Sequence, residues 1–156
     1  MIIISRSRRK VVDTHIFRLL PGQDLNKSIN DFVHNQRIAA GSILTCVGSL
    51  TRAVIRYANK PEGTQVDGHF EIVSLVGTVG MTGSHLHLSI SDGSGRMLGG
   101  HLLDGCLVYT TAEIVMASFP NLVFRREMCQ NSGYPELVIY TIQEAKKTQP
   151  EQQDQK

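Results

Sequence analysis

A chain of 156 residues has the size of one ordinary domain, which can bury a hydrophobic core without disulfides or a structural metal. Hydrophobic residues make up 41% of it and charged residues 19%, and a formal net charge of +2 is too small to indicate a nucleic-acid partner by itself. No apolar run approaches the roughly 18 residues of a membrane span, and the N-terminus lacks the charge order of a signal peptide, so we expect a cytoplasmic protein that contacts no membrane.

The first two predicted elements are a strand and an amphipathic helix. Polar and apolar side chains alternate over residues 11–20, and Pro21 and Gly22 then end the strand. Asp24 has the position of a helix N-cap, and apolar residues recur at helical spacing over residues 25–38. We therefore expect a helix whose apolar side packs on a sheet.

Two longer segments predict further strands. Residues 42–57 are rich in β-branched side chains, and the Gly-Ser pair in their middle predicts either two strands or one strand broken by a bulge. Residues 68–80 alternate so that Phe70 and Ile72 lie on one face of a strand and Glu71 lies on the other.

The next stretch carries three of the six histidines and predicts a hairpin. Polar and apolar side chains alternate over residues 85–91. His85 and His87 therefore share one face of a strand, while Leu86, Leu88 and Ile90 face a core. Asp92 and the Gly-Ser-Gly that follows have the composition of a tight turn. If Asp92 pairs with Arg96, the register places His87 opposite His101 and His85 diagonal to it.

Three imidazoles in this arrangement predict a metal site. Opposite Cβ atoms lie about 4.5–5.5 Å apart and diagonal ones roughly 7–8 Å apart, so ring nitrogens can meet on one ion at about 2.0–2.1 Å. We predict that His85, His87 and His101 bind one divalent metal, zinc by preference, with copper, nickel and iron as alternatives. A fourth position would remain for water or a small anionic ligand. Glu71 is a candidate fourth ligand or general base, and a solvated or salt-bridged carboxylate is the alternative.

The rest of the chain predicts more strands and a polar end. Residues 107–116 form a long apolar strand, residues 122–128 and 136–141 form the final two strands, and the polar tail from residue 143 to 156 is expected to be disordered. The predicted fold class is α/β (α+β), a mainly antiparallel sheet with one principal helix packed on it. The three cysteines are odd in number and widely spaced, so we expect core thiols in a reducing compartment: Cys46, Cys106 and Cys129.

The chain resembles the plants-and-prokaryotes-conserved (PPC) domain in three motifs, Gly68-x-Phe-Glu-Ile, His85-Leu-His and Gly99-Gly-His. The similarity spans residues 11–142, between a basic arm at 1–10 and the tail at 143–156. The resemblance implies a homotrimer, and it implies a metal at the three histidines in the bacterial and archaeal members that keep them. We take the strand at 107–116 as the candidate trimer interface.

The resemblance also implies a DNA-binding regulator, because plant members carry the domain behind AT-hooks in nuclear DNA-binding proteins. The Arg-Gly-Arg-Pro core of an AT-hook is absent here, but a cluster near the N-terminus offers charge to DNA phosphates: Arg6, Arg8, Arg9 and Lys10. The alternative is a metal-dependent enzyme or small-ligand-binding protein that uses the histidine site. A cupin shares the His-x-His strand, but it needs a glutamate shortly after the second histidine, where Ser91 and Asp92 stand.

Overall fold

The computed structural model describes residues 12–148, so the basic arm with Arg6, Arg8, Arg9 and Lys10 lies outside the described residues. The elements follow one another as β1 (Asp13–Leu19), α1 (Leu25–Asn35), β2 (Gly41–Arg56), β3 (Thr64–Val79), β4 (His85–Ser91), β5 (Met97–Leu102), β6 (Leu107–Ser118), β7 (Leu122–Met128), β8 (Pro135–Thr141) and α2 (Ile142–Lys147). No helix within this part of the chain is long and apolar enough to cross a membrane.

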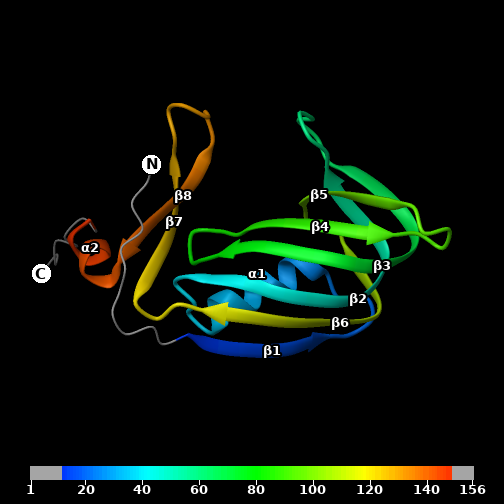
Figure 1. The fold of residues 1–156 in the computed structure, drawn as a ribbon, viewed down its shortest axis with the longest axis horizontal. Helices are drawn as coiled ribbons and strands as arrows, with labels where there is room; N and C mark the ends of the chain where they lie inside the picture. The colour runs from blue at the N-terminus through cyan, green and yellow to red at the C-terminus, as the bar shows by residue number, and fades with distance from the viewer. Residues whose placement is uncertain (1–11, 149–156) are drawn as a thin grey trace, which may run out of the picture.

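Six antiparallel strands form the main sheet in the order β1-β6-β2-β3-β4-β5. The end of β2 also pairs with β5, so that Arg56 lies opposite His101 and the strands from β2 to β5 close on themselves. Strands β7 and β8 form a separate hairpin, which stands at an angle to the main sheet in Figure 1. The predicted α+β class, with a mainly antiparallel sheet and one principal helix, is confirmed.

Helix α1 begins as the sequence predicts. The Asp24 carboxylate accepts a hydrogen bond from the backbone N–H of Lys27 at 3.1 Å and another from that of Gly105 at 2.6 Å. The apolar stripe of the helix is fully buried: Leu25, Ile29 and Val33. Burial of each such side chain contributes about 1.5–3 kcal/mol to stability. The helix ends three residues earlier than predicted, because Arg37 adopts a positive φ of 53° and turns the chain.

Strand β2 is one strand with irregularities, which confirms the second of the two predicted alternatives. Its register shifts between Gly48 and Leu50 against β6 and between Leu50 and Arg52 against both neighbours. Gly48 has a φ of 147°, and a methyl group there would overlap the carbonyl oxygen of Thr111. The glycine therefore allows β2 and β6 to approach closely at the bulge.

The C-terminal end differs from the prediction. Residues 143–147 were expected in a disordered tail, and this is wrong, because they belong to α2. A capping box starts this helix: the Thr141 hydroxyl accepts from the backbone of Glu144 at 3.3 Å, and the Glu144 carboxylate accepts from the backbone of Thr141 at 2.8 Å. Ala145 then packs into a buried position.

Two of the three cysteines lie in the core as predicted. Burial raises the pKa of the Cys46 thiol to about 12 and that of the Cys106 thiol to about 11, so both stay protonated. Cys129 differs, because it follows β7 in the β7–β8 turn and is only partly buried.

Candidate metal centre

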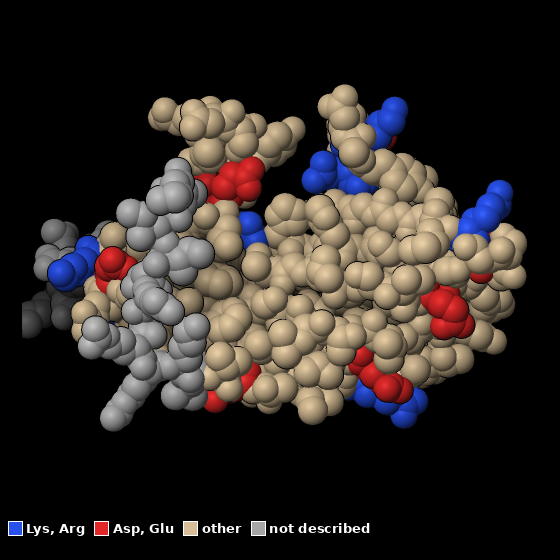
Figure 2. Space-filling model, in the orientation of Figure 1, with Lys and Arg blue, Asp and Glu red and all other residues tan. Residues whose placement is uncertain are grey.

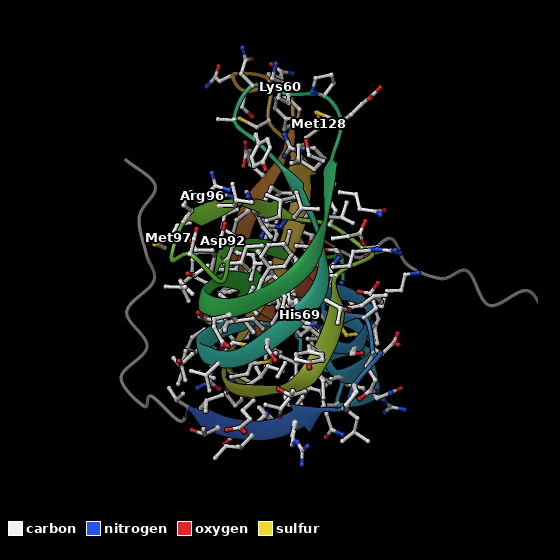
Figure 3. All side chains as sticks on the ribbon, turned by 90° about the vertical axis from the view of Figure 1, so that its right-hand side faces the viewer. Lys60, His69, Asp92, Arg96, Met97 and Met128 are labelled. Carbon is white, nitrogen blue, oxygen red and sulfur yellow. The ribbon has the colours of Figure 1, made fainter. Side chains whose placement is uncertain are left out.

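The β4–β5 hairpin has the register that its turn residues predict. The backbone N–H of Asp92 donates to the carbonyl of Arg96 at 2.9 Å, and that of Gly95 donates back to Asp92 at 2.9 Å. Asp92 and Arg96 lie together at this turn in Figure 3. From there the pairing runs without a shift to His87 opposite His101. The apolar residues that alternate with the polar ones along β4 are buried as expected: Leu86, Leu88 and Ile90.

The three histidines meet at the end of this hairpin. Ring centroids of His85 and His87 lie 5.0 Å apart, those of His85 and His101 also 5.0 Å, and those of His87 and His101 5.8 Å. Their potential ligand nitrogens all lie within 4.8 Å of one another. The Nε2 atoms of His85 and His87 are 3.1 Å apart, close to the ~3.3 Å that two nitrogens on one tetrahedral zinc ion require.

One nitrogen of the histidine cluster lacks a hydrogen-bond partner within the described residues, and a bound metal ion would supply a partner for it. Within residues 12–148, Nδ1 of His101 is buried and has no hydrogen-bond partner. Buried polar atoms almost always have a partner, since leaving one without costs about 1–3 kcal/mol. The donor set of three imidazoles is one that zinc binds. The residues present therefore fit a divalent metal ion.

The electrostatic surroundings keep two of the imidazoles neutral. Burial, with the neighbouring His85 and Arg56 as additional causes, lowers the pKa of His101 to about 4. Burial also lowers the pKa of His85, with Arg126 and His87 as additional causes. A histidine binds a metal ion as the neutral imidazole. The lowered pKa values of His85 and His101 therefore favour metal binding over protonation.

Close backbone contacts hold the hairpin in this position. Gly77 of β3 pairs with Leu86, and a methyl group at its φ of 143° would overlap the carbonyl oxygen of His85. A methyl group on Gly100 would lie 2.6 Å from the carbonyl oxygen of Arg56. The absence of a side chain at Gly100 thus allows β2 to approach β5 closely next to His101.

The structure does not bring Glu71 to the histidines, which corrects its assignment as ligand or base. Glu71 pairs with Ser91 at the far end of β4, whereas Val76 pairs with His87. Five positions along β3 separate Glu71 from Val76, roughly 16 Å at ~3.3 Å per residue. The alternation of side chains predicted the correct face of β3 for Glu71. It could not predict how far along the strand Glu71 lies from the histidines.

A cavity of about 820 Å³ adjoins the histidines and brings residues that the sequence did not single out. Its lining includes His85 and His101 together with Arg56, Lys60, Arg126 and Glu136. Figure 2 shows the hollow between the β7–β8 hairpin and the β2–β3 end of the sheet, with acidic side chains on the hairpin and basic ones both on the β2–β3 side and beneath the hairpin. These residues come from elements far apart in sequence, and no local pattern marks them.

Comparison with known proteins places the chain in a family. Residues 6–120 match the sequence profile of the Plants and Prokaryotes Conserved (PCC) domain, the PPC domain named above. A hypothetical protein of known structure from Salmonella enterica is 42% identical, with a TM-score of 0.84 over 88% of this chain and 99% of that chain. A metal-containing protein from Archaeoglobus fulgidus shares the fold at 24% identity, with a TM-score of 0.72 over 86% of this chain and 99% of that one.

Two curated relatives are longer proteins. The bifunctional protein GlmU of a Synechococcus strain is 43% identical over 137 residues, which are 88% of this chain and 22% of that protein. The AT-hook motif nuclear-localized protein 13 of Arabidopsis thaliana is 35% identical over 118 residues, which are 67% of this chain and 26% of that protein. The chain thus spans about a fifth to a quarter of the length of these relatives. Because the profile covers most of the chain, the chain belongs to the Plants and Prokaryotes Conserved domain family.

Proposed function

We propose that the chain binds one divalent metal ion, zinc by preference, through His85, His87 and His101. The observation that carries this proposal is the convergence of three ligand nitrogens, one from each histidine, to within 4.8 Å of one another, and the buried Nδ1 of His101 that lacks a hydrogen-bond partner within residues 12–148 supports it. Three imidazoles leave one position on zinc open, where the ion binds a small anion or a water molecule whose pKa it lowers to about 7. The function that follows is that of a metal-dependent ligand-binding protein or enzyme.

Metal analysis of the purified full chain tests this proposal. After equilibration with zinc and gel filtration, we expect one zinc ion per chain by mass spectrometry of the elements. Cobalt in place of zinc is expected to give the visible absorption of a four-coordinate site. A chain that carries only trace metal after this treatment would contradict the proposal.

We also propose a homotrimer, and the distribution of exposed side chains favours a surface other than the predicted strand alone. The predicted interface strand, now β6, lies between β1 and β2, and most of its apolar side chains face the core of its own chain. Exposed apolar side chains instead lie on β2, β3 and β6: Leu44, Val47, Val73, Val76 and Tyr109. A patch of this kind is typical of an interaction surface.

Light scattering measures the oligomer directly. At micromolar concentration we expect three times the chain mass of 17.3 kDa. The variant Val47→Lys is expected to shift the mass toward a single chain without unfolding it, because Val47 is 53% exposed within one chain. Lys27→Ala on helix α1 serves as a surface control. A wild-type chain that stays monomeric would reject the trimer.

A second candidate function is association with DNA, favoured by the 35% identity to a relative named for its AT-hook motif. We propose that Arg6, Arg8, Arg9 and Lys10 contact phosphates, with three copies of the arm acting together in a trimer. Removal of residues 1–10 is expected to weaken DNA binding and to reduce the salt slope by about 3 to 4 per chain, since each phosphate contact contributes about 0.9. Removal of residues 149–156 is the control. Equal binding by both truncated chains would exclude the arm as a DNA contact.

A further inference from the structure

Two arginines flank the histidines, and neither forms an ion pair with a carboxylate among residues 12–148. Arg126 is anchored from β7, because its Nη2 donates to the Thr78 hydroxyl at 2.6 Å and its backbone N–H donates to the Thr82 hydroxyl at 3.0 Å. Thr78 is the residue that pairs with His85. The Arg126 guanidinium therefore reaches across from the hairpin to the first metal-ligand position.

Arg56 flanks the site from the other side. It is the last residue of β2 and pairs with His101. Neither Arg56 nor Arg126 forms an ion pair with a carboxylate of residues 12–148, whereas Arg52 and Arg96 do so at 2.7 Å and 3.3 Å. Partly buried cations are unfavourable unless negative charge lies near them, and Glu136 supplies part of that charge to Arg126 without forming an ion pair with it.

The charge balance of the cavity favours an anion. Arg56, Lys60 and Arg126 carry positive charge among the lining residues, and Glu136 is the carboxylate that lines the same space. Lys60 lies in the β2–β3 turn at the same end of the molecule as Met128 of β7, as Figure 3 shows. With neutral histidines and a divalent ion, the excess of positive charge in the cavity grows further.

We infer that this cavity binds a small organic molecule through an oxyanion group, a carboxylate or a phosphate, held between Arg126 and Arg56. A second polar group of the same molecule would occupy the open position on the metal, and this part rests on the proposed function. Arginine suits the role because its planar guanidinium binds carboxylate and phosphate with two parallel hydrogen bonds. A volume of about 820 Å³ is that of a small-molecule site and exceeds what a lone inorganic ion fills.

Calorimetry on the zinc-equilibrated full chain tests the inference with three probes, which are succinate, inorganic phosphate and the uncharged succinamide. We expect binding of succinate, phosphate or both, and none of succinamide. Arg126→Gln is expected to weaken the binding at least about tenfold, because it removes charged hydrogen bonds to the anion. Arg56→Gln is a second variant with the same expectation, in case the first one fails to fold.

Arg125→Gln is the matched control on the same strand. The Arg125 side chain donates to the Thr148 hydroxyl at 2.8 Å and to the Ala145 carbonyl at 3.0 Å, so it points away from the cavity. We expect its anion affinity to stay within twofold of the wild type. Circular dichroism of each variant establishes that it is folded.

Several results would overturn the inference. Equal anion affinity in the wild type, Arg126→Gln and Arg56→Gln would show that the arginines do not hold the ligand, and succinamide binding as tight as succinate would show that charge is not recognised. A chain that binds zinc but neither anion refutes this inference and leaves the proposed function standing. A chain that binds no zinc but binds an anion in an Arg126-dependent way supports the arginine site and refutes the proposed metal function.

Discussion

Replacing His87 by Ala is expected to abolish stoichiometric metal binding and to leave the fold intact. Two imidazoles would remain, and the affinity should fall by at least about 100-fold, because even loss of a group that only orients a ligand costs about 10- to 100-fold. His87 is exposed on β4, so its truncation leaves no cavity in the core. The metal-free variant should therefore unfold within about 2 °C of the metal-free wild type.

The effect of zinc on thermal stability should distinguish the wild type from His87→Ala. Zinc at 100 times its dissociation constant stabilises the protein that binds it by about 2.7 kcal/mol, or roughly 5–10 °C for a domain of this size. The wild type should show this shift in thermal unfolding, and His87→Ala should not. The control is His69→Ala, since His69 lies on β3 (Figure 3), and its exposed ring packs on that of Tyr109 with 4.3 Å between the ring centroids.

Two outcomes would change the interpretation of the site. Full metal retention by His87→Ala would remove this residue from the ligand set. Unfolding of the wild type on removal of metal by a chelator would show a closed structural site, against the expectation that a core of this size holds the fold without a metal.

The histidine cluster was predictable because its geometry is local. A period of two fixes which side chains share a face, and the turn at Asp92 fixes the register, so the position of His101 follows from residues at most sixteen positions away. The helix was predictable for the same reason, since the Asp24 cap and the apolar spacing lie within one segment.

The rest of the site depends on contacts that no local pattern encodes. Arg56 reaches His101 because β2 pairs with β5, and Arg126 reaches His85 because the β7–β8 hairpin folds back over β3. The prediction of Glu71 as a fourth ligand or general base was wrong because it, too, depends on how the strands pair. Alternation gives the face of a strand, but the position along the neighbouring strand depends on how β3 pairs with β4, which sets Glu71 opposite Ser91 and Val76 opposite His87. Tertiary pairing therefore decides which charged groups join the histidines.

Because β3 fits closely against the histidine strand β4, Gly77→Ala is expected to destabilise the fold strongly. The φ of 143° at Gly77 is one that L residues rarely adopt, and the added methyl group would overlap backbone atoms of His85. Strain of about 1–3 kcal/mol and overpacking of about 1–3 kcal/mol together predict a loss of about 2–6 kcal/mol in the free energy of unfolding. At about 2–4 °C per kcal/mol, the midpoint of thermal unfolding should fall by about 4–24 °C.

The same substitution should weaken the metal site, because relief of the overlap moves the backbone that carries the first ligand. Zinc affinity in the folded variant is expected to fall at least about tenfold, since ligand nitrogens must hold their distances to within about 0.2 Å. Gly93→Ala is the matched control, because a methyl group on Gly93 meets no atom within 4 Å. Its unfolding midpoint and zinc affinity should equal those of the wild type. An unchanged midpoint in Gly77→Ala would mean that β3 and β4 can separate freely, and the hairpin would then not be held in place by this contact.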